Sequence, residues 1–329
     1  MKFDLQKDDA FAVLSSTKPV VENLHFVRIH NEKIEMIAKQ CEVEIKKGFG
    51  NANDHFGNAK TLEDHMQLIF LLDCINFCFW AEKDKPVWEV AFPKKEAPNG
   101  GWYGLTKCFA KALHNKIPLL DAAFLSKLTL PKAREIFVGQ DNVEIPLLPE
   151  RVRNLVEAGK VLLKKYDGKF IRVLEKAQYD VLNLVPLLYK DFSSFRDYSL
   201  FNGEKVYFLK RAQICAQDLS YLSTIYKEFE MKHLDSVTAF ADYKVPQMLR
   251  YFGAISYTID LANKIDTKTL IKKDSREEIE IRAATIWCVE KMRQVNDAYT
   301  AAQLDNALWQ ISQNNIGILP YHRTKTIFY

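Results

Sequence analysis

The stretch Phe240-Ala-Asp-Tyr-Lys-Val-Pro-Gln-Met-Leu-Arg-Tyr-Phe-Gly253 predicts a helix with a carboxylate at its entrance. Proline is tolerated in a first helical turn, where its missing N–H would have no partner, so Pro246 marks the helix start. Gly253 tolerates the left-handed conformation that ends a helix. Asp242 precedes the helix and is flanked by Phe240 and Tyr243. It can cap the helix by accepting backbone hydrogen bonds, or it can face a developing positive charge.

Helical periodicity extends over most of the remaining chain. Apolar residues at one-turn spacing over 34–45 share a face of a helix that Asn31 caps and Gly48 ends. A second clear helix starts at Pro149 and closes at Gly168. The run 206–209 fits either a short strand or a helix start, and periodicity does not decide between them.

Three residue pairs have the spacing of a capping box, in which two side chains satisfy the first backbone N–H groups of a helix. They are Thr61 with Asp64, Ser275 with Glu278, and Thr300 with Gln303. The first pair predicts a long apolar helix that continues through Trp80. The predicted fold class is mainly α with at most a few short strands. Because no linker marks a boundary, residues 1–329 are expected to form a single domain, with any subdivision near 130–149.

Composition narrows the class of protein. The chain has 329 residues, of which 48% are hydrophobic and 27% charged, as in a soluble globular protein with an ample core. Its formal net charge is +4. A duplex-binding protein carries a denser basic face, so a stable nucleic-acid complex is not expected. A phosphorylated small molecule is compatible with this charge.

The six cysteines form no C-x-x-C pair and have no histidine partners at metal-ligand spacing. We expect buried free thiols rather than a metal site, which is typical of a reducing compartment. The N-terminus lacks the apolar core of a signal peptide. The most apolar run, Leu68 to Trp80, is too short to span a bilayer. These features predict a cytoplasmic protein without a membrane partner.

A second carboxylate, Asp305, lies within a predicted helix. Trp309 follows it by four residues and therefore shares its face, and Asn306 and Gln310 form a second such pair beside it. An aromatic plane next to carboxylate and amide groups suits stacking on a purine-like base and recognition of its edge. The alternative is an ordinary amphipathic helix, with Trp309 in the core and Asp305 in solvent.

The stretch around Asp242 resembles the helix that follows the hairpin in helix-hairpin-helix base-excision glycosylases. Six sequence blocks occur in a characteristic order: Asn76–Trp80, Lys210–Gln213, Phe240–Gln247, Ile281–Trp287, Leu304–Trp309 and Pro320–Thr324. Through these blocks, across most of its length, the chain resembles the queuosine salvage family, the queuosine 5′-phosphate N-glycosylases.

The resemblance implies a helical, DNA-glycosylase-like fold that hydrolyses queuosine 5′-monophosphate to queuine and ribose 5-phosphate without a metal or organic cofactor. Asp242 would stabilise the oxocarbenium-like sugar or activate water. Asp305 would orient ribose or water, or bind the base, and these two roles are exchangeable. Gln310 stands near a position where related chains carry an acidic residue, and its amide cannot replace a catalytic carboxylate. His55 resembles the histidine that lies near the substrate in this family.

A 5′-phosphate requires cationic donors. Two basic pairs lie within the family blocks, and they are Lys210-Arg211 and His322-Arg323. Either pair fits phosphate contacts or structural salt bridges.

Other functions and roles stay open. Arg282 is expected to be a buried ion-pair partner, with an active-site Asp as one candidate for the pair. Phe240 and Tyr243 either stack on the base or pack in the core. Two other functions fit the sequence, namely a nucleic-acid glycosylase and a non-catalytic protein that binds queuine or its nucleotide.

Overall fold

Helices dominate the computed structural model, which describes residues 9–48, 59–93, 95–314 and 318–329. Strands in these ranges form only small two-stranded antiparallel sheets, which pair β1 with β6, β2 with β3, and β4 with β5. The mainly α prediction is confirmed. None of the helices in the described ranges combines the length and apolarity needed to cross a membrane.

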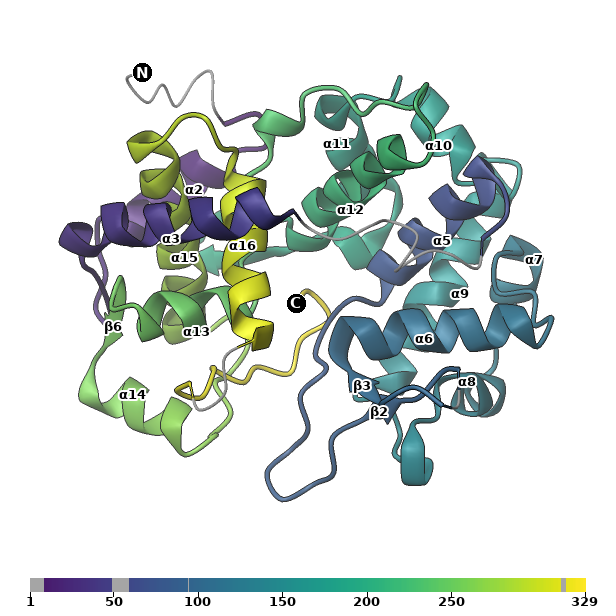
Figure 1. The fold of residues 1–329 in the computed structure, drawn as a ribbon, viewed down its shortest axis with the longest axis horizontal. Coiled ribbons are helices and arrows are strands. Elements are labelled where there is room, and N and C mark those ends of the chain that lie inside the picture. Colours follow the sequence, from purple (N-terminus) through teal and green to yellow (C-terminus); the bar gives the residue numbers. More distant parts are fainter. Residues whose placement is uncertain (1–8, 49–58, 94, 315–317) are drawn as a thin grey trace.

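One group of helices joins the N-terminal part of the chain to its C-terminal part (Figure 1). Its members pack around the long helix α15 or on its neighbours. They are α2 (Val13–Val21), α3 (Ile34–Lys47), α13 (Lys244–Tyr251), α14 (Ile259–Asp266), α15 (Arg276–Val295) and α16 (Ala301–Asn314), with strands β1 (Val27–Ile29) and β6 (Ile255–Tyr257).

The middle of the chain forms a second group, built around the apolar helix α5 (Figure 1). Its members are α5 (Leu62–Cys74), α6 (Gly101–His114), α7 (Ala122–Leu125), α8 (Leu130–Phe137), α9 (Leu148–Lys165), α10 (Ile171–Lys176), α11 (Val181–Asp191), α12 (Lys210–Ser220), β2 (Glu89–Val90) and β3 (Asn99–Gly100). The hairpin of β4 (Tyr198–Phe201) and β5 (Glu204–Tyr207) contacts α2 and α15, and so connects the two groups. Residues 130–149 lie within the second group.

Side-chain caps begin α5, α15 and α16 as predicted, whereas the predicted Asn31 cap is wrong, because Asn31 lies inside a 3₁₀ turn and no side chain caps α3. The Thr61 hydroxyl accepts the N–H of Asp64 at the start of α5, and Ser275 does the same for α15. Before α16, Thr300 and Gln303 exchange hydrogen bonds between side chain and backbone in both directions. The helix α3 follows a single 3₁₀ turn over Asn31–Lys33 and ends before Gly48, which has a φ of +85°.

The prediction that α5 continues through Trp80 is wrong, because the helix ends at Cys74. The carbonyl groups that leave the helix ladder here are bound by two buried arginines. Arg151 donates to the carbonyls of Ile75, Phe77 and Cys78, and Arg211 donates to those of Asp73 and Cys74. These bonds offset the cost of burying unpaired carbonyls, which makes the irregular backbone stable in an apolar environment.

The helix around Pro246 forms as α13, but it begins at Lys244, two residues earlier than the proline indicates. Pro246 then occupies the third helical position, where its missing N–H is still not needed. Gly253 follows the helix with a φ of +78°. The ambiguous run at 206–209 divides between the end of β5 and the left-handed residue Leu209 that precedes α12.

Candidate active site

A cavity of about 810 Å³ lies between the two helix groups. Its walls come from α12 and the segment 76–87 on one side, and from α16 and the loop 240–244 on the other. The start of α6, residues 266–268 at the end of α14, and the chain from Tyr321 onward also contribute to the lining. Segments that lie far apart in sequence therefore line the same cavity.

The structure brings most of the predicted site residues into this cavity. Asp242 and Asp305 both line it. So do Lys210, Phe240, Tyr243, Asn306, Trp309, Gln310 and Arg323. The α16 residues lie on one face, which confirms the shared face of Asp305 and Trp309 and excludes the alternative with Asp305 in solvent, since only 4% of Asp305 is exposed.

Asp242 caps α13 and also faces the cavity. Its Oδ1 accepts the N–H groups of Lys244 at 2.7 Å and Val245 at 2.9 Å, while Oδ2 receives no hydrogen bond within the described chain. Burial raises the pKa of this carboxyl group, and the Lys210 charge and the two N–H groups oppose that rise. The helix N-terminus further favours the anion.

Asp305 lies deeper than Asp242 and has fewer partners. Its Oδ2 accepts the backbone N–H of Phe240 at 2.9 Å, which joins α16 directly to the loop that carries Asp242. Burial, followed by the nearby Asp242 charge, raises the pKa of Asp305 well above its usual range. When one carboxyl group of this pair is ionised, the environment makes Asp242 the anion and Asp305 the neutral acid.

Lys210 places a positive charge near both acids. It is 4% exposed, and its ammonium group lies 3.5 Å from the carbonyl oxygen of Asn76. Burial lowers the pKa of Lys210, whereas Asp242 and Asp73 act to raise it. Lys210 therefore stabilises the Asp242 carboxylate in a region with little water.

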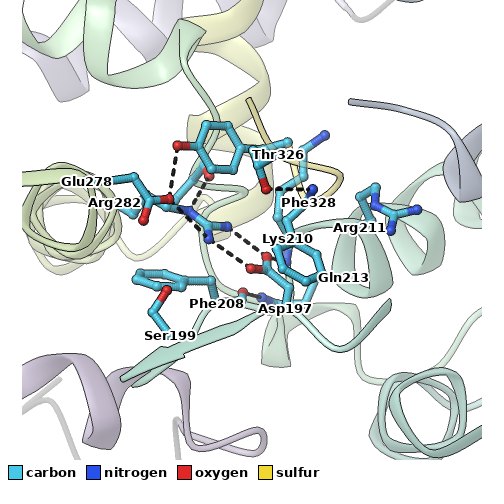
Figure 2. A network of polar contacts seen from close by, with 12 residues as sticks. Asp197, Ser199, Phe208, Lys210, Arg211, Gln213, Glu278, Arg282, Thr326 and Phe328 are labelled. Atoms are coloured by element: carbon cyan, nitrogen blue, oxygen red, sulfur yellow. Dashed lines mark hydrogen bonds and ion pairs between the residues drawn. The ribbon is translucent and has the colours of Figure 1, made fainter. Parts of the chain in front are cut away.

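A buried ion pair holds Lys210 and the loop before Asp242 in place (Figure 2). Arg282 of α15 donates to both carboxylate oxygens of Asp197, at 2.8 and 2.7 Å, and to the carbonyl of Ala241 at 3.1 Å. The same Asp197 accepts the backbone N–H of Lys210 at 3.0 Å. The expected buried ion pair of Arg282 is confirmed, but its partner is Asp197 rather than an acid that lines the cavity.

Aromatic and amide groups form the remaining walls. The rings of Trp309 and Tyr103 lie 5.8 Å apart, and those of Tyr243 and Tyr321 lie 4.8 Å apart. The Asn306 amide donates to the Tyr221 hydroxyl at 2.6 Å. Flat apolar surfaces that alternate with amides and hydroxyls suit a planar heterocycle with polar edges.

Arg323 and Lys244 provide cations in the part of the cavity near Tyr321. The Arg323 Nη1 atom is buried and has no hydrogen-bond partner within the described chain. The Lys244 ammonium lies 5.3 Å from the centre of the Tyr321 ring, and Arg323 also interacts with the Tyr321 hydroxyl. A buried guanidinium nitrogen without a partner marks a place for an anion.

Two predicted phosphate ligands do not line the cavity, and these predictions are corrected. Arg211 is 1% exposed and uses both Nη atoms on the backbone carbonyls of Asp73, Cys74 and Ser194. His322 lies against Tyr329, and burial lowers its pKa to about 3, so it is neutral. His55 lies outside the described residues.

Sequence reasoning missed Asp218, Lys244 and Tyr321, all of which line the cavity. Asp218 follows Lys210 by eight residues, so helical spacing from a predicted site residue was an available signal. Tyr321 adjoins the predicted pair 322–323. The six cysteines are free and buried, as expected. Among the described residues, no group of three or more His, Cys, Asp or Glu side chains is arranged to hold a metal ion.

Residues 55–329 match the protein family described as queuosine salvage protein. The chain is 37% identical to the queuosine 5′-phosphate N-glycosylase/hydrolase of Sphaerobacter thermophilus, over 98% of both chains. It is 32% identical to the protein of that name from Mus musculus, again over 98% of both chains. For the Bos taurus protein the identity is 30%, over 95% of this chain and 97% of the bovine one.

Proposed function

Since this chain belongs to the queuosine salvage protein family, we propose that it hydrolyses the N-ribosidic bond of queuosine 5′-monophosphate. The products are queuine and ribose 5-phosphate, and the released base serves the queuosine modification of tRNA. The observation that carries this proposal is the meeting of Asp242, from the loop before α13, and Asp305, from α16, in one cavity with Lys210. We also propose that the fold is similar to that of helix-hairpin-helix glycosylases.

The two carboxyl groups suit the two halves of the reaction. As the bond between C1′ and the base nitrogen breaks, the sugar becomes positively charged and the base takes the electron pair. The Asp242 carboxylate faces the sugar and takes a proton from the attacking water, whose oxygen bonds to C1′. Asp305, which holds its proton more tightly, gives that proton to the departing base. Proton transfer from Asp242 to Asp305, through water, restores both groups.

Different walls of the cavity contact different parts of the substrate. Trp309 and Phe240 offer surfaces for the base, and the amides of Asn306 and Gln310 offer donors and acceptors for its edge. Arg323, with Lys244 beside it, binds the 5′-phosphate. Lys210 is not assigned to the phosphate, because its ammonium group interacts with Asp242 and Asp73.

The proposal extends to the domain organisation and the cellular compartment of the protein. Both helix groups contribute residues to it, so we propose that residues 1–329 work as one domain. Free buried cysteines suit a reducing compartment, which favours the cytoplasm. A net charge of +4 favours a small-molecule substrate over a nucleic-acid partner.

The direct test is incubation with queuosine 5′-monophosphate, followed by chromatography of the released base. We expect stoichiometric queuine and much slower release from the nucleoside that lacks the phosphate. Saturable binding without base release would instead favour a carrier protein. Tight, salt-dependent binding of duplex DNA would favour a nucleic-acid glycosylase.

A further inference from the structure

The face of α12 that lines the cavity carries a second acidic feature beyond the Asp242–Asp305 pair. Lys210 and Asp218, two turns apart, both line the cavity. No hydrogen bond or ion pair within the described residues engages the Asp218 carboxylate. Behind it, Asp73 of α5 is fully buried. Its Oδ1 accepts the Asn76 amide at 3.3 Å and its carboxyl group interacts with the Cys215 thiol, while Oδ2 has no hydrogen-bond partner among the described residues.

The charges in this part of the cavity do not balance. Lys210 interacts with the carboxyl groups of Asp73, Asp218 and Asp242, and also with that of Asp305. Arg211 also acts on Asp73, and Lys244 acts on Asp242, whereas Lys210 is the cation that acts on Asp218 among the described residues. Burial raises the pKa of Asp73 to about 7 and that of Asp218 well above its usual range, and the neighbouring Asp73 charge adds to the rise at Asp218. A cation bound at Asp218 would oppose that rise.

The positive groups at the other part of the cavity do not fill this need. The charged groups that act on Asp218 are Asp73 and Lys210, and neither Arg323 nor Lys244 is among them. Arg323 and Lys244 instead lie near Tyr321. Asp218 therefore lacks the cations that Arg323 and Lys244 provide near Tyr321, which suits a substrate that carries a positive group on its base and a negative group on its sugar.

We propose that Asp218, with Asp73 behind it, binds an ammonium group on the side chain of the base and thereby selects nucleotides with a cationic base. This inference rests on the proposed function, and it identifies the ammonium group as the feature of the substrate that Asp218 recognises. The side chain of queuine contains a secondary amine, protonated near neutral pH, that leads to a ring with two hydroxyl groups. Gln217 and Tyr221 line the cavity beside Asp218 and offer partners for those hydroxyls.

The test uses two nearly isosteric substrates, the 5′-monophosphates of 7-aminomethyl-7-deazaguanosine, which is cationic, and 7-hydroxymethyl-7-deazaguanosine, which is neutral. We expect the wild-type protein to favour the cationic one in kcat/KM by about 10- to 100-fold, the range for a hydrogen bond between charged groups. Asp218→Asn should reduce that preference to about 3-fold or less. Its kcat/KM for the neutral substrate should fall less than its kcat/KM for the cationic one.

Asp84→Asn is the matched control, because Asp84 is an exposed carboxylate of the same cavity and its φ of +61° tolerates asparagine. This variant should keep the wild-type preference. Asp218→Glu, which retains the charge, should restore part of the preference. An undiminished preference in Asp218→Asn, or an equal loss on both substrates, would overturn the inference while leaving the proposed function intact.

A calorimetric measurement with the two free bases separates the inference from the proposed reaction. If the wild-type protein releases no base from any nucleotide, the proposed function fails. Weaker binding of the aminomethyl base by Asp218→Asn, with unchanged binding of the hydroxymethyl base, would still support the ammonium site. Equal affinities of the wild-type protein for the two bases would reject it.

Discussion

Two buried polar regions of this protein contain the same kinds of charged groups but leave them in different states. In the brace formed by Arg282 and Asp197, each guanidinium nitrogen donates a hydrogen bond and both carboxylate oxygens accept one. In the cavity, Arg323 Nη1 and the Oδ2 of Asp242 have no hydrogen-bond partner within the described chain. The charged groups of the brace are paired on folding, whereas the cavity leaves charged atoms available to a ligand.

The comparison separates structural from functional charges more reliably than residue type does. Lys210 and Arg211 are neighbours in sequence, yet Lys210 lines the cavity and Arg211 binds carbonyl groups of the core. Likewise, Arg323 lines the cavity, whereas its neighbour His322 lies against Tyr329. Substitutions in the brace should therefore reduce stability, and substitutions in the cavity should reduce activity with little effect on stability.

The largest effect on activity is expected for Asp242→Asn. The amide oxygen can still accept the N–H groups of Lys244 and Val245, so the start of α13 should form normally. Loss of the negative charge beside the sugar should lower the rate of base release by about 1000-fold. Single-turnover release of queuine measures this rate, and a thermal unfolding midpoint near that of the wild type shows that the fold is kept. A rate within 10-fold of the wild type would contradict the role of Asp242.

In the brace, Arg282→Met should give the largest loss of stability. It leaves the Asp197 carboxylate buried without its partner, which should lower the free energy of unfolding by about 3–5 kcal/mol. Lys39→Gln breaks the exposed ion pair with Glu35 and should leave the free energy of unfolding nearly unchanged. Denaturant unfolding of both variants gives the comparison. Similar small changes for the two would show that the brace is not needed for stability.

A smaller effect is expected for Arg323→Gln, which removes the cation assigned to the 5′-phosphate. Its kcat/KM for queuosine 5′-monophosphate should fall by about 10- to 100-fold, while that for the nucleoside should stay nearly constant. Lys325→Gln, two residues away and exposed, is the control and should leave both values unchanged. If Arg323→Gln impaired nucleoside and nucleotide equally, the phosphate would have to bind elsewhere.

The most gradual effect concerns Asp73 and pH. Burial raises its folded-state pKa to about 7, whereas an unfolded aspartate titrates near 4. The folded state holds the proton more tightly, so the stability that this proton provides is complete below about pH 4 and is lost as the pH rises to about 7. Relative to Asp73→Asn, the wild-type free energy of unfolding should fall by about 1 kcal/mol per pH unit in this window and then level off. A pH-independent difference would show that Asp73 is not the titrating group.

Local signals predicted much of the fold. Hydroxyl caps at Thr61, Ser275 and Thr300 begin helices because a side chain three residues before a backbone N–H satisfies it without help from the rest of the chain. The α5 terminus was missed because Arg151, distant in sequence, binds the carbonyls beyond Cys74. The spacing of residues within 61–80 cannot predict a contact with a residue so distant in the chain.

For the site, the chain alone determined that Asp242 stands at a helix entrance and that Asp305 and Trp309 share a helix face, since both follow from helix geometry. The resemblance between sequence blocks supplied the substrate. Only the tertiary structure decided which basic side chains are available to a ligand, and it added Asp218 to the cavity. The reason is physical: whether a charge is compensated depends on groups that folding brings together, and their distance along the chain carries no information about that.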